Sequence, residues 1–356
     1  MSETNKEIYL ITSDNGFYGQ SRKPWISIDT ANIFKYLIDG GYKVHALEYH
    51  QAVAQSSGIR DSVVLYSFSQ MSNTRLYLRD LAQTLSTQNN LLLPSYELLL
   101  CHENKGYQEL FKKRLGVGDL WGLYLESKEQ IGQYQIEYPV VLKAVGGSNA
   151  KGVHLVRSRE ELLKRLSSME GKLSAYHRLD LLRRKLFRAK QSFPGWDKYA
   201  RQPDIDQYTR HIKPRLRFVL QEFVPGLDCD YRVIVMRDRY FVSRRLTRPG
   251  DWRASGTKLF TYSTTPDAEI LNYAREFFAK VKMPVLAMDL GKSARGIHLF
   301  EFQGSHFGIT PIHKGPGYFE HQAGAWKLVK AQGDFERYLA DAVLGFLNDH
   351  LSPTRD

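Results

Sequence analysis

The sequence predicts an α/β protein in two parts, a parallel-sheet domain followed by a larger domain that mixes strands and helices. Short apolar strands alternate with amphipathic helices over about the first 100 of the 356 residues, which is typical of a parallel sheet covered by helices. From residue 103 onward, strands that form hairpins replace this alternation. A chain of this length is expected to hold two or three domains, and we predict domain bounds of 1–100 and 101–356.

The first domain begins with a predicted strand at 8–12 and a polar loop from Ser13 to Trp25. Gly40 and Gly41 close an amphipathic helix that starts near residue 28. Further strands are predicted at 42–47, 62–66 and 91–93, with a helix at 75–85. Loops at the carboxyl ends of parallel strands often hold ligands, so the loop 13–25 is a candidate substrate loop. A long surface loop without a role is a comparably good interpretation.

The second domain opens with a predicted helix at 104–115, which Gly116 to Asp119 interrupt. An apolar strand at 138–145 then runs into a glycine-rich loop, and a second strand at 153–157 completes a hairpin. The later strands are predicted at 217–224, 231–236, 240–246, 285–290 and 297–303, and the later helices at about 159–167, 268–281 and 335–350.

Several classes of protein do not fit this sequence. No stretch approaches the roughly 18 apolar residues of a membrane helix, and the first residues lack the apolar segment of a secretory signal. Cys101 and Cys229 are too few for a disulfide scaffold, and they favour a reduced, cytoplasmic location. The histidines are scattered, without the short spacing of a zinc site.

The first group of residues with chemical meaning is Lys143 and the loop after it. A lysine in an apolar strand is costly unless its ammonium group meets an anion. Gly146, Gly147 and Gly152 let backbone N–H groups approach a phosphate. The spacing fits neither a P-loop nor a dinucleotide motif. A flexible hairpin tip, with Lys143 reaching out to water, is the alternative.

Two further groups lie at the ends of predicted strands. Gln221 to Val224 precede Pro-Gly, and such an edge can present backbone groups and a carboxylate to an adenine and a ribose, although an ordinary turn is the commoner case. Asp289 ends one strand, and Glu301 and Gln303 share a face of the next one because they are two residues apart. Two carboxylates and an amide oxygen suit Mg²⁺, and solvated surface carboxylates are the alternative.

Together these groups predict a cleft with a glycine-rich flap, an adenine edge and a metal-binding floor. With them, the sequence resembles the ATP-grasp superfamily, and most closely its ribosomal-protein glutamate ligase branch of carboxylate–amine ligases. The resemblance runs from about Pro94 to Ser305, apart from a large insertion. The residues that carry it are Asn104-Lys105, Lys143 with its glycine-rich loop, Gln221-Glu222-Phe223-Val224, Asp230-Tyr231-Arg232, Arg244-Arg245, Trp252-Arg253 and the pair Asp289 and Glu301.

The resemblance implies a fold: an N-terminal Rossmann-like, pre-ATP-grasp domain and an ATP-grasp domain of two α+β subdomains. The flap subdomain would span about 138–224 and contain a basic helical insertion at about 168–215. The metal-binding subdomain would span about 225–356.

The resemblance also implies roles for single residues. Arg232, Arg245 and Arg253 would be catalytic, holding the acceptor carboxylate and the transferred phosphoryl group. Asp289, Glu301 and Gln303 would bind Mg²⁺, with Mn²⁺ as an alternative. At two positions where the family usually has Asn, this chain has Gln303 and Ser255. The residues implied to bind ATP are Lys105, Lys143, Gly146, Gly147, Ser148, Gly152, Gln221, Glu222, Phe223, Val224 and Asp230.

The implied activity is a Mg-ATP-dependent ligase that joins a carboxylate to an amine or amino acid through an acyl phosphate. Phosphoryl transfer needs positioning and charge neutralisation, which lysines, arginines and Mg²⁺ supply. A closing flap would protect the acyl phosphate from water. A small-molecule kinase on the same fold and a non-catalytic ATP-binding regulatory module are the alternatives.

The chain's net charge of +12 is concentrated in one segment. Residues 157–217 contain 17 basic and 7 acidic side chains, an excess of ten. Leu179, Leu182, Leu186 and Ala189 recur there at helical spacing, which predicts a basic amphipathic helix. It could dock an acidic acceptor such as a glycan, a nucleotide sugar or a peptide, join an oligomer, or be a solvated face. Nucleic acid is disfavoured, since the tyrosines are too scattered to form a stacking platform.

Overall fold

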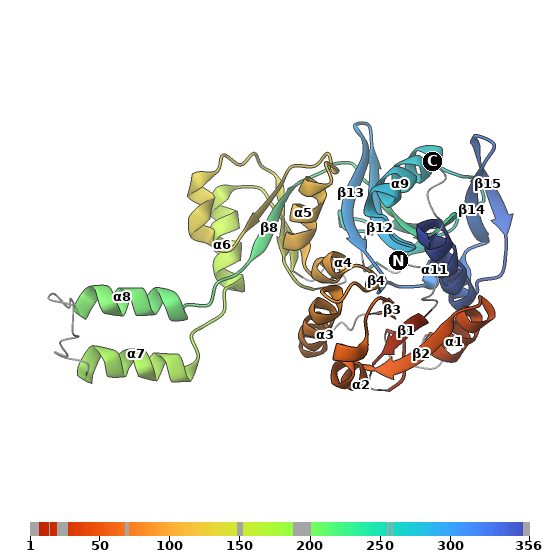
Figure 1. The fold of residues 1–356 in the computed structure, drawn as a ribbon. Coiled ribbons are helices and arrows are strands. Elements are labelled where there is room, and N and C mark those ends of the chain that lie inside the picture. Colours follow the sequence, from red (N-terminus) through yellow and green to blue (C-terminus); the bar gives the residue numbers. More distant parts are fainter. Residues whose placement is uncertain are drawn as a thin grey trace. The chain divides into compact units, whose positions relative to one another are not determined.

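The computed structural model describes residues 7–13, 15–19, 28–67, 71–147, 152–187, 201–254, 256–257 and 259–351. Within these ranges the chain forms two compact units (Figure 1). The first unit comprises Met1–Trp121, Gly146–Lys151 and Val224–Asp356, and the second comprises Gly122–Val145 and Gly152–Phe223. None of the described helices is long and apolar enough to cross a membrane. The domain bounds predicted from the sequence stay a prediction.

The first unit begins with the predicted parallel sheet. Its strands β1 (Glu7–Thr12), β2 (Lys43–Glu48), β3 (Val63–Tyr66) and β4 (Leu91–Leu93) lie in the order β2-β1-β3-β4, all parallel. The helices that connect these strands are α1 (Thr30–Asp39), α2 (Tyr49–Ala54) and α3 (Ser72–Ser86), and α4 (Tyr96–Cys101) follows β4.

Helices cover both faces of this sheet. Helix α1 is capped by the Asp29 side chain, which accepts a hydrogen bond from the backbone N–H of Asn32. On this face α1 packs beside α11 (Phe335–Leu351), the last helix of the chain (Figure 1). On the other face, α2 and α3 pack against residues of β1 and β3. The prediction of a covered parallel sheet is therefore confirmed.

The second sheet of the first unit has seven strands and is antiparallel. Its strands are β9 (Cys229–Met236), β10 (Arg239–Leu246), β12 (Val285–Ser293), β13 (Gly296–Gln303), β14 (Gly317–Gln322) and β15 (Ala325–Lys330), in the order β13-β12-β9-β10-β14-β15, with the short β11 (Phe260–Thr261) on β10. Helix α9 (Ala268–Val281) covers one face through Ile270, Leu271 and Phe277. Helix α5 (Lys105–Arg114) lies beside β13, and the short α10 (Thr310–Lys314) precedes β14.

The opposite face of this large sheet changes character along its strands. At one end Ile234, Met236 and Val285 pack against α11 in the same core as β1 and α1. Toward the other end the same face carries Asp230 and Arg232, because side chains two apart in a strand share a face. A continuous apolar core therefore gives way to a polar surface on one side of the sheet.

The second unit contains a four-stranded sheet with the order β5-β8-β6-β7. Strands β6 (Val140–Ala144) and β7 (Val153–Val156) form the predicted hairpin, and β8 (Phe218–Glu222) pairs with β6 and with β5 (Gly122–Leu125). A 3₁₀ helix at Lys128–Gln133 and helix α6 (Arg159–Met169) contribute apolar side chains to its core. The basic insertion forms α7 (Ala175–Phe187) and α8 (Arg201–Ile212), which pack against each other.

Candidate active site

Strand register brings the predicted metal ligands together on the large sheet. Asp289 of β12 pairs directly with Glu301 of β13, and Ala287 pairs with Gln303. Directly opposed residues of an antiparallel pair place their side chains on the same face, and residues two apart do so as well. The three predicted ligands therefore share one face of two neighbouring strands.

Two of the predicted arginines join the same face. Arg232 of β9 pairs with Asp289 of β12, and Asp230 of β9 pairs with Arg245 of β10. The Arg232 guanidinium donates from Nε and Nη2 to the Asp289 carboxylate at 2.5 and 3.0 Å. Arg245 donates to both oxygens of Asp230 at 2.5 and 2.7 Å, and its Nη2 lies 2.9 Å from Asp289 Oδ2. We call these four residues the ion cluster.

Burial and the neighbouring arginines together set the protonation of the two carboxyl groups in the ion cluster. Asp230, Arg245 and Asp289 are each less than a tenth exposed. Burial raises the pKa of Asp230, although Arg245 acts in the opposite direction. Burial also disfavours the charged form of Asp289, but Arg232 and Arg245 outweigh it and lower the pKa of that carboxyl. Asp289 is therefore held as a carboxylate by two guanidinium groups.

Lys105 approaches this face from the first residue of α5. The preceding Asn104 caps the helix by accepting a hydrogen bond from the N–H of Tyr107. The Lys105 ammonium donates to the carbonyl of Gly147 at 2.7 Å and lies 4.0 Å from Glu301 Oε1. Lys105 is only 8% exposed, so its charge is confined to this position. The first unit thus places one lysine between the glycine-rich segment and a predicted metal ligand.

Gly147 is also bound from its other side. Its N–H donates to Glu103 Oε2 at 2.9 Å. Glu103 adopts a positive φ of 50°, so this residue makes the turn between α4 and α5 in a conformation uncommon outside glycine. Glu103 and Lys105 together hold both polar groups of the Gly147 backbone.

The second unit contains a separate group of predicted residues. Lys143 of β6 donates to Gln221 Oε1 of β8 at 2.6 Å, and Gln221 is 1% exposed. Gly152 has a φ of +73°, and a Cβ there would lie 2.9 Å from Ala144 Cβ, so the hairpin requires a glycine at this position. Glu222 ends β8, Phe223 follows it, and Val224 is buried.

Some predicted residues are not brought into these groups. Arg253 is bonded to Asp251, through its backbone N–H and its guanidinium, each at 3.0 Å. Ser148 and Ser255 lie outside the described residues, as does most of the candidate substrate loop after Gly19. Cys101 and Cys229 are buried free thiols.

The donor set fits a magnesium ion. Its members are carboxylate and amide oxygens, which this hard cation prefers, and they share one face. Asp289 is already bonded to two arginines, while Glu301 and Gln303 are half-buried. Among the residues that the structure describes, no group of three or more His, Cys, Asp or Glu side chains could hold a metal. Binding here would therefore use the amide of Gln303 and oxygens from outside the chain, such as phosphate.

Sequence reasoning missed a buried polar cluster near the carboxyl ends of β1 and β3. Ser67 follows β3 and is 1% exposed, and His102 and His306 are 5% and 6% exposed. The two imidazole rings meet edge to face with centroids 5.2 Å apart. A Cβ on Gly19 would lie 3.1 Å from Ser67 Oγ and 3.6 Å from His306 Nδ1. Gly19 follows β1 and Ser67 follows β3, and these two strands are neighbours in the sheet order β2-β1-β3-β4. The chain continues from β1 to β2 on one side and from β3 to β4 on the other. Ligands often bind at such a point of a parallel sheet.

A second missed group contains a serine, a histidine and an aspartate. His298 of β13 is fully buried, its Nε2 lies 2.7 Å from Ser293 Oγ, and its Nδ1 is bonded to the Asp119 carboxylate. Ser293 Oγ also accepts a hydrogen bond from the N–H of Arg295 within the β12–β13 turn. These bonds tie the end of the β12–β13 hairpin to the segment after α5. Only the folded chain brings Asp119 to this hairpin.

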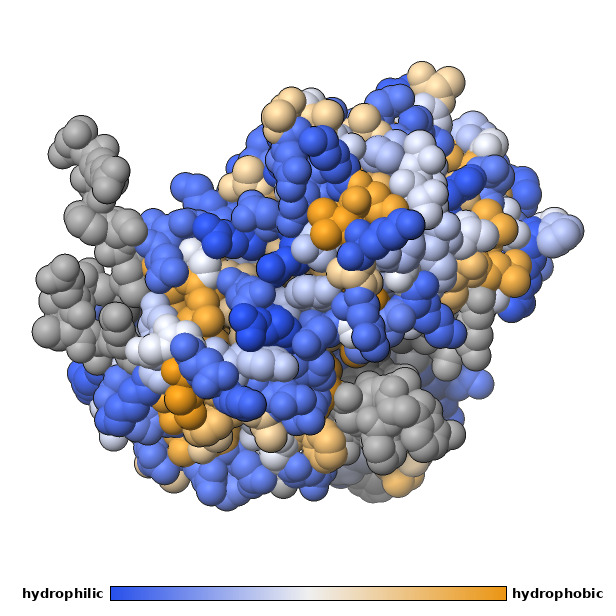
Figure 2. Space-filling view, turned by 90° about the vertical axis from the view of Figure 1, so that its right-hand side faces the viewer, coloured by the Kyte–Doolittle hydropathy of each residue, from blue (hydrophilic) through white to orange (hydrophobic). Residues whose placement is uncertain are grey.

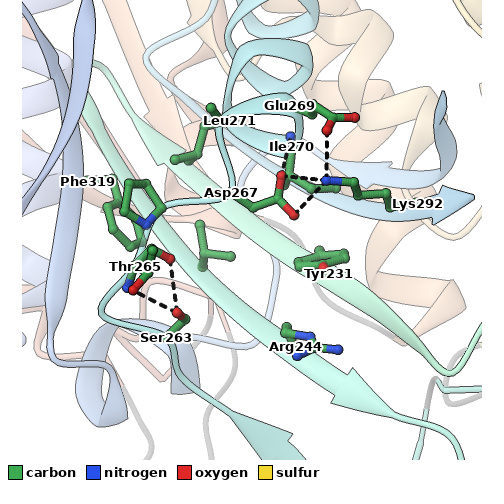
Figure 3. Close-up of a pocket in the computed structure, with 13 residues that line it drawn as sticks. Tyr231, Arg244, Ser263, Thr265, Asp267, Glu269, Ile270, Leu271, Lys292 and Phe319 are labelled. Carbon is green, nitrogen blue, oxygen red and sulfur yellow. Dashed lines mark hydrogen bonds and ion pairs between the residues drawn. The ribbon is translucent and has the colours of Figure 1, made fainter.

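A cavity of about 460 Å³ lies on the opposite face of the large sheet. Figure 3 shows side chains that line it. Tyr231 and Arg244 line it from β9 and β10, and Lys292 points into it from β12 (Figure 3). Lys292 is bonded to Asp267 at 3.1 Å and to Glu269 at 3.0 Å, so its charge is compensated by the first residues of α9. The lining includes none of the predicted site residues, so this cavity is distinct from the ion cluster.

Solved structures with TM-scores above 0.5 share this architecture. No family model matches the chain, and no curated protein matches it either. The D-cycloserine synthetase DcsG superposes with a TM-score of 0.53 at 11% identity, over 96% of this chain and 99% of that one. The ATP-grasp ligase PsnB, complexed with a minimal precursor, superposes with a TM-score of 0.51 at 12% identity, over 95% and 99% of the two chains. A RimK domain ATP-grasp protein from Sphaerobacter thermophilus has a TM-score of 0.47 at 12% identity, over 95% and 100%.

The chain has the ATP-grasp fold. The predicted fold class, an N-terminal parallel-sheet domain followed by an ATP-grasp domain of α+β character, is therefore confirmed.

Proposed function

We propose that this protein is a Mg-ATP-dependent ligase that joins a carboxylate to an amine through an acyl phosphate. The observation that carries the proposal is the polar face of the large sheet, where Arg232, Arg245, Asp289 and Glu301 are aligned by strand register and Lys105 lies beside them. Cations and carboxylates in register on rigid strands suit the positioning of phosphate groups.

In this proposal Lys105 and Lys143 bind ATP phosphates, and the backbone of Gly146, Gly147, Ser148 and Gly152 approaches them. Gln221 to Val224 bind the adenine and Glu222 binds the ribose. Asp230 is less suited to the ribose, since both of its oxygens are bonded to Arg245 in a buried position. We therefore assign Asp230 to orienting Arg245.

The reaction would proceed in two steps. The acceptor carboxylate attacks the γ-phosphorus of ATP, which gives an acyl phosphate and ADP. The amine then attacks the acyl carbon, the C–O bond to phosphate breaks, and the amide and inorganic phosphate leave. Glu301, Gln303 and Asp289 would hold Mg²⁺, which neutralises charge on the phosphates.

The arginines have complementary tasks in this scheme. Arg232 and Arg253 would orient the acceptor carboxylate and the transferred phosphoryl group, because a planar guanidinium binds two oxygens at once. Arg245 is 7% exposed and shared by two aspartates, so it would act mainly by fixing the position of Asp289. The buried salt bridges make this arrangement rigid before substrate arrives.

The test measures ADP and phosphate while acids and amines are supplied separately and together. We expect both products only when an acid and an amine are present. Lys143→Ala and Glu301→Ala should abolish product formation, whereas Glu320→Ala on strand β14 serves as the matched control. ADP with a phosphorylated product and no free phosphate would indicate a kinase. ATP binding without turnover across the acceptor panel would indicate a regulatory module.

A further inference from the structure

Helix α7 of the basic insertion presents a row of leucines to solvent. Leu179, Leu182 and Leu186 are 66%, 52% and 60% exposed, and Ala175 continues their row at the start of the helix. The spacing along the row is four, three and four residues, which keeps all of these side chains on one side of the helix. We call this row the leucine seam. Grouped exposed leucines are typical of docking surfaces.

The packing of α8 does not use the leucine seam. Asp180 of α7 accepts hydrogen bonds from Arg184 Nε at 3.0 Å and from the hydroxyl of Tyr208 on α8. The Arg184 guanidinium also lies 3.6 Å from the centroid of the Tyr208 ring. Asp180 and Arg184 therefore mark the side of α7 that faces α8, and the leucine seam lies on another side.

The residues beside the leucine seam carry positive charge. With Leu179 and Leu186 at position a of a heptad and Leu182 at position d, Arg178 and Lys185 occupy position g and Arg183 occupies position e. These flanking positions form the ion pairs that select partners in paired helices. All three basic side chains are exposed, although Arg183 also contacts Asp180.

We infer that the leucine seam binds an acidic amphipathic helix of a peptide or protein partner. An apolar row with acidic flanks would cover the leucines and neutralise Arg178, Arg183 and Lys185 together. A second copy of α7 would place like charges opposite each other. A glycan or a nucleic acid would leave the leucines uncovered. The seam is also narrower than the broad apolar face of helices that lie on membranes. This inference does not depend on the proposed ligase activity.

The test uses two labelled synthetic peptides of three heptads, both with leucine at a and d. One has glutamate at e and g and the other has lysine there. In fluorescence anisotropy the full-length protein should bind the acidic peptide at least about tenfold more tightly than the basic one. Arg178→Glu combined with Lys185→Glu should reverse that preference, whereas Lys164→Glu with Arg165→Glu on α6 should not change it.

The leucines need a separate variant. Leu179→Gln with Leu182→Gln should abolish peptide binding, while Leu76→Gln, at a similarly exposed leucine of α3, should leave it intact. Circular dichroism verifies that each variant is folded. Equal affinity for the two peptides, or no binding of the acidic one, overturns the inference. Self-association removed by the leucine variants would assign the leucine seam to a second copy, and binding to anionic phosphatidylglycerol vesicles without peptide binding would assign it to a membrane.

Discussion

At the scale of single residues, the ion cluster shows partners of Asp289 that the sequence did not reveal. The resemblance implies that Asp289 binds metal, which stays a prediction, and the structure shows its carboxylate bonded to Arg232 and Arg245. A common site for Asp289 and Glu301 was predictable, because Asp289 ends one predicted strand and Glu301 lies on the next strand along the chain. The arginine partners were not, since they depend on the register among β9, β10 and β12, which no local pattern encodes.

The adjacent residues Arg244 and Arg245 allow a matched test of this cluster. Arg245→Met should lower the free energy of unfolding by about 3–5 kcal/mol, because it leaves two buried carboxylates with one cation fewer. Arg244 points to the opposite face and its side chain is 40% exposed, so Arg244→Met should cost less than about 1 kcal/mol. Urea unfolding of both variants measures the difference. Equal losses would show that the cluster contributes no more than surface charge.

At the scale of elements, long amphipathic helices were predictable, whereas short strands of mixed polarity were not. The helices at α5, α9 and α11 and the β6–β7 hairpin have clear periodicity or a glycine-rich turn. Strands β5, β14 and β15 were missed, because four to six residues with mixed polarity give little periodic signal. The α7 helix was expected from its leucine spacing. Its solvent-facing leucines could not be foreseen, since periodicity does not tell what covers a face.

The contact between α7 and α8 gives the Asp180 carboxyl group an unusually low pKa. The hydrogen bond from Tyr208, followed by those from Arg184 and Arg183, lowers the pKa of Asp180 from 3.8 to about 2. The ion pair thus contributes fully above pH 3.8 and is lost as the pH falls toward 2. An NMR pH titration of the side chain should show this low value. Tyr208→Phe should raise it toward 3.8, and an unchanged pKa in that variant would refute the bond between the two helices.

At the scale of the whole molecule, the fold joins chemistry from segments far apart in the sequence. Helix α11, the last element, packs both on α1 and on β9 and β12, so the two sheets of the first unit share one core. Hydrophobic residues on the face drawn in Figure 2 lie in small separate groups among hydrophilic ones. Alternation of strands and helices predicted the parallel sheet and hairpin-forming strands indicated the second one, but only the packing of α11 explains why the core is common to both.

His102, which directly follows α4, is buried, and its burial makes the stability of the protein depend on pH. Burial, His306 and Arg75 lower the pKa of His102 from 6.5 to about 2. Below pH 6.5 the unfolded chain binds a proton at this residue and the folded chain does not, so acid favours unfolding.

One proton bound only by the unfolded chain lowers the free energy of unfolding by up to about 1.4 kcal/mol per pH unit. Because half of the unfolded chains carry this proton at pH 6.5, the loss between pH 6.5 and about pH 5 is about 1.6 kcal/mol. His102→Gln should therefore reduce the difference in unfolding free energy between these pH values by that amount, whatever its effect at neutral pH. His211→Gln, at an exposed histidine of α8, serves as the matched control. Urea unfolding followed by tryptophan fluorescence at both pH values measures it, and the same pH dependence in wild type and His102→Gln would show that His102 is protonated in the folded protein.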